Sequence, residues 1–527
     1  MCKPFITVLM LFLSLNNASA GSSLILMPDK AAMENIRNNI GAYNTIGKTI
    51  DIPQPISTQN AGAWINAGGF SIWKLPIQTH GEYGTVVFFE KLIMPDGGEI
   101  KAYTPDSILQ TPTFTENPNK KGVSFALPGL PANEIVVEIR IPIQKRNELE
   151  VEIKKIGSII VNKLYRASKK PGFGDAPLCF ANVNCSEGAP WQDQSRSVAK
   201  YMTIEGSDIG YCTGSLVNNT NQNCKNYFLT AQHCGMGATT AELGQFIFYF
   251  NYESPNCTNP ASENGLTNQT VIGCSRKASS GTRLTLPPDG SDFQLLELNA
   301  IPASYNVYFA GWNRNAIEHL QGPGSIIQHP QGDIKKIAFW NKIQIAPLAL
   351  DHLEVGMIAS EHGDGTVVPM SSGSPVFDAN KLIVGNVTHG SSGCISAEPG
   401  ASVYGGMLFY HWDKHGKGAD RQLKPWLDPS NSGVTTLAGK NQCGNVGMEK
   451  TRAGKTIFIS HQPTANAFEI VSNDIIERTI LYNTNGARVG MWRNLNSIPI
   501  VQLPNGLYFV TIKYSKGVFT TYFIKRN

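Results

Sequence analysis

The chain has few charged residues for its length and no long apolar run. Charged side chains make up 16% of its 527 residues, and the formal net charge is only +4. There is no dense lysine and arginine stripe, so a nucleic-acid-binding protein is not expected. No segment after the first twenty residues has the roughly 20 apolar residues of a membrane-spanning helix. The sequence also lacks internal repeats, low-complexity tracts and C-x-x-C pairs, and we expect no metal and no organic cofactor.

Glycine and proline, in contrast, are plentiful. The sequence contains 51 Gly and 31 Pro, a composition that favours turn-rich β structure over helix bundles. At roughly 150 residues per domain, the length predicts three or four domains.

The first twenty residues are typical of an export signal. Lys3 precedes an apolar run at residues 5–15, and Ala18 and Ala20 form a small-residue cleavage site. The run is too short for the alternative interpretation, a membrane anchor. We predict that residues 1–20 are a signal peptide, cut after Ala20, and that the protein is secreted or held at the cell surface.

Nine cysteines lie beyond the signal, eight of them between residues 179 and 394. In an exported protein such cysteines are expected to form disulfides. An odd number leaves at least one thiol free or exchangeable.

Short alternating apolar and polar runs flank this cysteine-rich body on both sides. Residues 84–89, 100–103 and 134–141 predict strands of an N-terminal β-sandwich at 21–173. We interpret this part as a pro-region, with a permanently attached binding module as the alternative. The basic, Pro- and Gly-rich residues 166–174 suit an exposed processing linker. Runs at 456–460, 479–482 and 506–513 predict a small β-sandwich at 450–527.

Three polar side chains suggest nucleophilic catalysis. His233 ends an apolar run at 227–232 between two cysteines, Asp292 precedes the apolar run 293–298, and residues 371–375 read Ser-Ser-Gly-Ser-Pro. Taken alone, His233 would be interpreted as a surface histidine and Asp292 as a turn residue. In the order His, Asp, Ser they match chymotrypsin-type serine peptidases, with Ser372 as nucleophile.

Longer motifs carry a more specific resemblance. Residues 212–220, 227–237, 291–298, 310–312 and 426–430 resemble the lysyl endopeptidase branch of the chymotrypsin superfamily. The resemblance implies that residues 174–445 form a double β-barrel, with His233 as base, Asp292 as orienting acid and Ser372 as nucleophile. It also implies three disulfides: Cys179–Cys394, Cys185–Cys257 and Cys212–Cys234. Cys224, Cys274 and Cys443 have no partner in that pattern.

The C-terminal residues 450–527 resemble a type IX secretion sorting domain. The motif at 503–510 and the basic end Lys525-Arg526 carry this resemblance. It implies a Bacteroidetes-type bacterium, a partnership with outer-membrane secretion machinery and removal of the domain during export.

Two departures from the lysyl endopeptidase pattern affect the site. The residue two before the nucleophile is normally Gly but is Met370 here, so the oxyanion hole expected from the N–H groups of Met370 and Ser372 is strained. The pocket acids of the family are replaced by Val368 and by Ser402-Val403. A lysine ammonium needs a buried carboxylate, so we predict an apolar or uncharged P1 residue, unless Glu398 substitutes.

The expected substrate contacts come from two segments. Residues 387–390 predict a strand edge that pairs with substrate backbone. His389 marks either glutamyl specificity or a structural histidine. The predicted substrate-binding residues are Val368, Val387, Thr388, His389, Gly390 and Val403.

The sequence thus predicts an all-β protein: a chymotrypsin-like double β-barrel flanked by an N-terminal β-sandwich pro-region and a small C-terminal β-sandwich. We expect a monomeric serine endopeptidase, made as a zymogen, that acts on protein or peptide substrates. Self-cleavage between Phe173 and Gly174 is expected to yield the mature start. The alternative is a secreted binding or adhesion protein with a catalytically weak peptidase fold.

Overall fold

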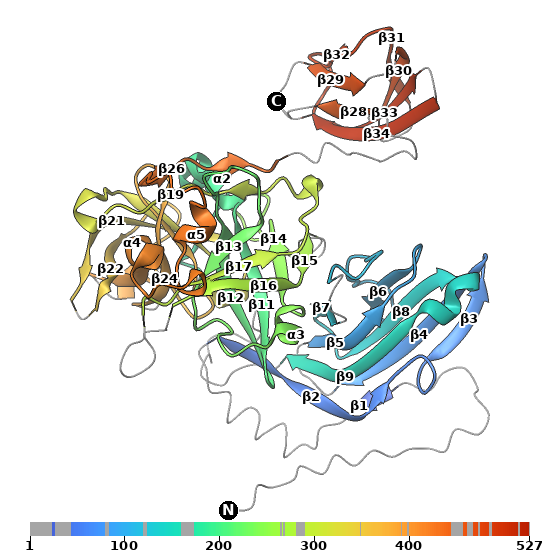
Figure 1. Ribbon diagram of the computed structural model, residues 1–527, viewed down its shortest axis with the longest axis horizontal. Helices are drawn as coiled ribbons and strands as arrows, with labels where there is room; N and C mark the ends of the chain where they lie inside the picture. Colours follow the sequence, from blue (N-terminus) through green and yellow to red (C-terminus); the bar gives the residue numbers. More distant parts are fainter. Residues whose placement is uncertain are drawn as a thin grey trace, which may run out of the picture. The chain divides into compact units, whose positions relative to one another are not determined.

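The structure, a computed structural model (Figure 1), describes most of the chain outside the N-terminal signal region. The described residues are 24–26, 44–79, 84–119, 124–159, 173–263, 266, 269–280, 290–347, 349–391, 393–397, 400–443, 457–460, 467–472, 475–483, 487–514 and 517–525. The predicted signal peptide at 1–20 and most of the predicted linker at 166–174 lie outside them. Within the described part, no helix has both the length and the hydropathy to cross a membrane. Two compact units are present, residues 1–442 and 443–527.

The N-terminal part is a sandwich of two sheets. One sheet has the order β1-β4-β8-β6 with β3 paired to β4, and the facing layer has the order β2-β9-β5-β7. Alternation along β4 and β8 buries one face of each strand between the layers, with Trp73 fully buried. The strands are β1 (Leu24–Leu26), β2 (Thr45–Ile56), β3 (Ala63–Ala67), β4 (Phe70–Thr79), β5 (Gly84–Ile93), β6 (Glu99–Tyr103), β7 (Phe125–Leu130), β8 (Glu134–Pro142) and β9 (Glu150–Ile159).

The next segment forms the first barrel. Its core contains stacked and edge-on aromatic rings of Tyr201, Phe228 and Phe248. The strands are β11 (Val198–Glu205), β12 (Asp208–Leu216), β13 (Tyr227–Thr230), β14 (Ile247–Phe250), β15 (Thr270–Ile272), β16 (Cys274–Ser279) and β17 (Gln294–Leu298).

Strand β2 joins the N-terminal sandwich to this barrel. It pairs with β9 on one side and with β12 on the other, so one sheet of 11 strands runs through both parts. Figure 1 shows β2 in blue leaving the green barrel toward the N-terminal layers. The N-terminal sandwich therefore docks on the first barrel by backbone pairing as well as by side-chain packing.

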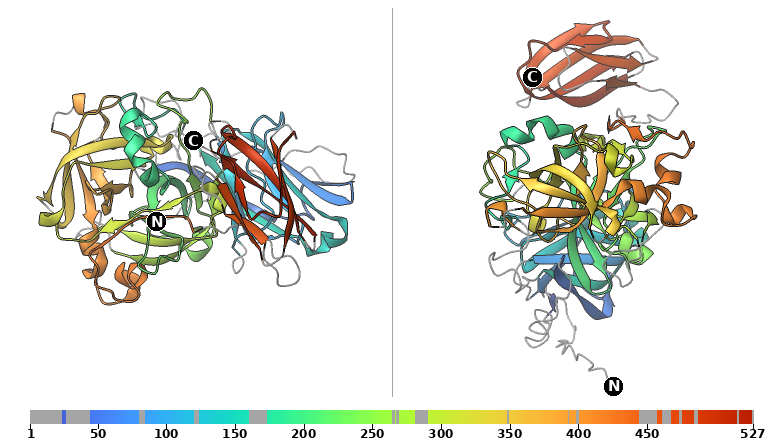
Figure 2. Two further views of the ribbon diagram at one scale, coloured as in Figure 1. Left: turned by 90° about the horizontal axis from the view of Figure 1, so that it is seen from above. Right: turned by 90° about the vertical axis from the view of Figure 1, so that its left-hand side faces the viewer.

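The second barrel is a closed ring in which β20, β21, β22, β25, β24 and β23 pair in turn and β23 also pairs with β20. Figure 2 shows it in yellow and orange beside the green first barrel. A further buried cluster that includes Trp312 and Phe377 draws residues from both barrels. The strands are β20 (Gly324–Gln328), β21 (Lys336–Ala346), β22 (Ala349–Ile358), β23 (Pro375–Phe377), β24 (Ile383–Gly390) and β25 (Ser402–Met407).

Short elements complete residues 173–442. The α-helices are brief, four to six residues each, as expected for an all-β fold. They and the remaining strands are β10 (Ala181–Asn182), α2 (Gln192–Ser195), α3 (Thr240–Leu243), β18 (Tyr308–Phe309), β19 (Trp312–Asn313), α4 (Leu408–Asp413), α5 (Lys424–Leu427), β26 (Thr436–Leu437) and β27 (Lys440–Asn441).

The cysteines form the three disulfides that the lysyl endopeptidase resemblance implies. They are Cys179–Cys394, Cys185–Cys257 and Cys212–Cys234. Cys224 and Cys443 carry no free thiol either. Among the described cysteines, the free thiol expected from the odd count is Cys274, whose pKa is raised by burial.

The C-terminal unit is a two-sheet β structure. One sheet has the order β28-β29-β32, the other β31-β30-β33-β34, around a core that includes Phe468, Leu481 and Val510. The runs predicted at 479–482 and 506–513 lie in strands, and so do the described residues 457–460 of the run predicted at 456–460. The strands are β28 (Ile457–Ser460), β29 (Ala467–Ser472), β30 (Ile476–Asn483), β31 (Arg488–Arg493), β32 (Ser497–Pro499), β33 (Gly506–Tyr514) and β34 (Gly517–Lys525).

Candidate active site

His233 lies in a turn just after β13, at the side of the first barrel. The disulfide Cys212–Cys234 fixes the turn to β12. Gln294, the first residue of β17, donates from Nε2 to the carbonyl of Cys234 at 2.9 Å. The disulfide and the Gln294 hydrogen bond thus restrict the position of His233, whose side chain is only 11% exposed.

Asp292 holds the imidazole from the turn just before β17, the strand that pairs with β13. Its carboxylate accepts the His233 backbone N–H at 3.0 Å, and its Oδ2 lies 2.8 Å from Nδ1 of the ring. Burial disfavours a charged His233, but the Asp292 charge and hydrogen bond outweigh it, so the pKa of His233 is raised above its usual value. Asp292 itself is fully buried. This pair can orient a general base and stabilise the imidazolium that forms when the base accepts a proton.

A second buried network supports the Asp292 turn from the opposite barrel. Asn386 donates to the Asp292 carbonyl at 3.0 Å, and Nε2 of His411 lies 2.8 Å from Asn386 Oδ1. The Ser291 hydroxyl lies 2.6 Å from His411 Nδ1. Burial is the main cause that holds the pKa of His411 well below its usual value, so this ring stays neutral. Asn386 and His411 were not predicted, because neither occurs in a motif that marks a catalytic role.

Ser372 lies in the loop that leads into β23 of the second barrel, across from His233. The Thr213 N–H donates to its carbonyl at 2.9 Å, and its Oγ lies 3.2 Å from Nδ2 of Asn44. Among the described residues, no hydrogen bond links Ser372 to His233. The structure thus brings the three predicted catalytic residues to one junction between barrels while the serine hydroxyl bonds to the N-terminal sandwich.

Met370 has the left-handed backbone that its place in the loop requires. Its φ is +74°, a conformation that costs a non-glycine residue about 1–3 kcal/mol. The Thr213 hydroxyl donates to the Met370 carbonyl at 2.9 Å, and the Met370 N–H donates to Oδ1 of Asn44 at 2.9 Å. The amide therefore points to the same place as the Ser372 hydroxyl, as an oxyanion donor must.

The predicted substrate-binding residues fall into two groups. Val368, Val387, Thr388 and Val403 are at most 8% exposed, and Val387 and Val403 pack in the core of the second barrel. The side chains of these two valines therefore do not face substrate, because the strand alternation turns them inward. His389 and Gly390 remain accessible at the end of β24, where β23 has stopped pairing.

One carboxylate lies beside the positions where the family acid is missing. The His389 ring stacks on Tyr404 at 4.9 Å, and the Tyr404 hydroxyl donates to Glu354 at 3.3 Å. Glu354 also accepts from Gln344 at 2.9 Å. Hydrogen bonds from Gln344 and then from Ser402 and Tyr404 lower the pKa of Glu354 against partial burial. Glu398, the substitute considered from the sequence, lies outside the described residues.

The two barrels and the His233–Asp292 pair agree with the similarity of this chain to known proteins. Residues 173–405 match the lysyl endopeptidase C-terminal domain family. The lysyl endopeptidase of Pseudomonas aeruginosa is 28% identical over 220 residues, which are 41% of this chain and 45% of the relative. The chain thus spans about half the length of the curated relative that it matches.

Solved structures also align with part of this chain. The protease Anisep from Arthrobacter nicotinovorans aligns with 15% identity over 40% of this chain and 90% of its own, at a TM-score of 0.27. A Glu endopeptidase aligns with 18% identity over 45% of this chain and 92% of its own, at a TM-score of 0.26.

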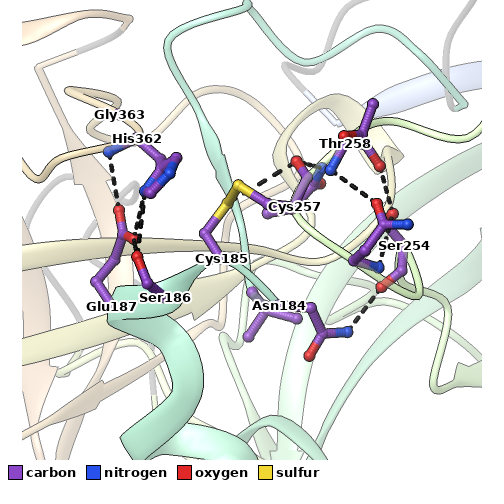
Figure 3. The surroundings of a disulfide bond; sticks show 12 residues. Asn184, Cys185, Ser186, Glu187, Ser254, Cys257, Thr258, His362 and Gly363 are labelled. Carbon is purple, nitrogen blue, oxygen red and sulfur yellow. Dashed lines mark hydrogen bonds and ion pairs between the residues drawn. A yellow bond between two sulfur atoms is a disulfide. The ribbon is translucent and has the colours of Figure 1, made fainter.

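One cluster in the lysyl endopeptidase-like segment has the composition of a metal site. Glu187, Glu361 and His362 lie close together, and Figure 3 shows Glu187 and His362 near the Cys185–Cys257 disulfide. The Glu187 carboxylate already bonds to His362 Nδ1 at 2.8 Å and to the Ser360 hydroxyl at 2.8 Å. Burial opposes ionisation, but these and backbone hydrogen bonds outweigh it and lower the pKa of Glu187 to about 2. These hydrogen bonds tie the 3-10 helix Ser186–Trp191, just ahead of α2, to the segment that carries Ser360 and His362, and we assign the cluster no metal.

Proposed function

We propose that this protein is a serine endopeptidase that hydrolyses protein substrates through an acyl-enzyme. The observation that carries the proposal is the buried His233–Asp292 pair, 2.8 Å apart, on the barrel facing the Ser372 loop. Two further observations support it: the Met370 N–H points toward the place where the Ser372 hydroxyl lies, and residues 173–405 match the lysyl endopeptidase C-terminal domain family.

In the proposed mechanism, His233 removes the Ser372 proton as Oγ attacks the scissile carbonyl. Asp292 stabilises the imidazolium, and the N–H groups of Met370 and Ser372 receive the oxyanion. The imidazolium then protonates the leaving amine. Water, activated by His233, hydrolyses the ester and restores the serine.

We place this activity in an exported precursor. Residues 1–20 would be removed as a signal peptide, 21–173 as a pro-region, and 450–527 during passage through a type IX secretion system. The family match, which begins at residue 173, supports a mature start at Gly174. Residues 174–445 would then be the secreted, monomeric peptidase.

An organophosphonate probe tests the proposal directly, because it modifies only an activated serine. We expect mass spectrometry of the processed protein to find the label on Ser372 and the His233→Ala chain to remain unlabelled. Failure of the folded protein to label after its N-terminal fragment has been removed would reject the peptidase and favour a secreted binding protein with the strained Met370 loop.

The proposed P1 preference is an apolar or uncharged side chain. Glu354 already accepts hydrogen bonds from Gln344 and Tyr404, so it is engaged within the protein. The presence of this carboxylate nevertheless favours a second candidate, a basic P1 residue, because an ion pair with Glu354 would stabilise the desolvated P1 cation.

Cleavage of a diverse peptide library separates these two specificities. We expect cleavage after uncharged residues, with a profile that changes less than about twofold in Glu354→Gln. The exposed Glu318→Gln substitution, also in the second-barrel segment, is the matched control. Cleavage after Lys and Arg that falls about tenfold or more in Glu354→Gln alone would contradict the uncharged preference, since tenfold corresponds to about 1.4 kcal/mol.

A further inference from the structure

Asn44, from the N-terminal sandwich, occupies the position where a substrate would react. Its Oδ1 accepts the Met370 N–H at 2.9 Å, and its Nδ2 lies 3.2 Å from the Ser372 Oγ. The same Nδ2 lies 3.4 Å from Cys212 Sγ, beside the disulfide that fixes the His233 turn. One side-chain amide thus contacts the proposed nucleophile and an oxyanion donor together.

Backbone pairing fixes this side chain in place. The Tyr211 N–H donates to the Asn44 carbonyl at 3.0 Å, and the next residue, Thr45, begins β2 opposite Gly210 of β12. A Cβ at position 210 would lie only 3.0 Å from the Asn44 carbonyl oxygen. Gly210 therefore allows the approach that directs Asn44 into the junction between the barrels.

The geometry is that of an inhibitor and not of a substrate. In a productive complex, the serine oxygen faces a carbonyl carbon and gives its proton to the histidine. Here the amide nitrogen faces the oxygen, and Nδ2 donates to the lone pair that Oγ would use for attack. Since no hydrogen bond joins Ser372 to His233, the base is not engaged either.

Apolar side chains join the N-terminal sandwich to the first barrel near Asn44. Ile46, Val86 and Phe88 of the sandwich share one buried cluster with Ile209 of the first barrel. A polar contact adds to this apolar cluster: Gln245 of the barrel segment donates to the Phe89 carbonyl of the sandwich at 3.0 Å. Contacts of this kind hold two chains together without a covalent link.

We propose that the N-terminal sandwich is a built-in inhibitor that blocks the site through Asn44 and stays bound after the chain is cut near residue 173. This inference rests on the proposed peptidase function. Its consequence is that cleavage alone does not activate the enzyme, and that the site opens only when the N-terminal fragment dissociates or is degraded.

The full-length Asn44→Ala chain tests the role of the amide. We expect an organophosphonate to label Ser372 in the uncut band at least about tenfold faster than in the wild-type chain. Asn119→Ala is the matched control. Asn119 is also an N-terminal asparagine that contacts the barrel, donating to the Gly244 carbonyl at 2.7 Å, but it lies away from the site. Thermal unfolding of all three chains checks that the variants fold.

A second measurement tests the sandwich independently of the substitution. The processed wild-type preparation is separated by size exclusion, and each fraction is labelled. We expect a fraction in which both fragments co-elute and label slowly, and faster labelling once the N-terminal fragment is gone.

The outcomes separate the two proposals. Equal labelling of wild-type and Asn44→Ala uncut chains, or a cut complex that labels as fast as the separated enzyme, overturns the inhibitor and leaves the peptidase standing. Equal acceleration by Asn119→Ala also overturns the specific role of Asn44. No labelling in any folded chain or fraction overturns the peptidase itself.

Discussion

The Ser372→Ala chain is expected to hydrolyse peptides about 10⁶-fold more slowly than the wild-type enzyme, because the substitution removes the oxygen that is proposed to attack the scissile carbonyl. The same substitution is expected to leave the Phe173–Gly174 bond uncut if the chain processes itself. Initial rates on a fluorogenic peptide and mass spectrometry of the N-terminus measure the two effects.

Ser371→Ala is the matched control for this substitution. The Ser371 hydroxyl is one residue away and accepts only a long hydrogen bond, 3.4 Å from the Val368 N–H. We expect this variant to keep its activity and its processing. Loss of activity in Ser371→Ala with retention in Ser372→Ala would show that the nucleophile has been placed one residue too late in the loop.

The Asp292→Asn chain is expected to lose about 10⁴-fold in kcat, because an amide neither holds the imidazole tautomer nor stabilises the imidazolium. The pH profile should change as well. Burial lowers the pKa of His233, and the Asp292 charge and hydrogen bond raise it overall. Activity needs the neutral base, so the acid limb of wild-type kcat/KM should lie above the usual histidine value of about 6.5. Removal of the charge should move that limb to lower pH.

The His233–Asp292 pair affects stability and activity in opposite directions as the pH rises: activity increases, whereas the pair's contribution to the stability of the fold decreases. A folded-state pKa raised above the unfolded value means that the His233–Asp292 pair stabilises the fold most below the unfolded pKa. That contribution is lost as the pH rises through the folded pKa.

Asp378→Asn is the control for a general loss of stability, because Asp378 is also a buried carboxylate, in the second barrel. An Asp292→Asn enzyme with an unmoved acid limb and a twofold loss in rate would contradict the role of this pair.

The local parts of this description were predictable. The strands at 84–93, 134–142 and 506–514 follow from short apolar or alternating runs bounded by turn residues, because those signals are carried by neighbouring positions. The disulfides came from resemblance to a family and not from spacing, and the odd cysteine count correctly indicated a free thiol.

The contacts that regulate and support the site were not predictable in this way. Asn44 precedes a strand, a common place for asparagine, and it is 328 residues from Ser372. Asn386 and His411 carry no motif, and Glu354 became relevant only when β22 paired with β25 beside Tyr404. Each of these depends on which strands become neighbours.

The sequence by itself determined the all-β class, the positions of several strands and the side chains proposed for catalysis, since these depend on local periodicity and short motifs. Only the tertiary structure decided that the N-terminal sandwich continues the sheet of the first barrel and that Asn44 bonds to Ser372. The physical reason is that strand pairing between distant segments is selected by the packing of whole faces, which no local pattern encodes.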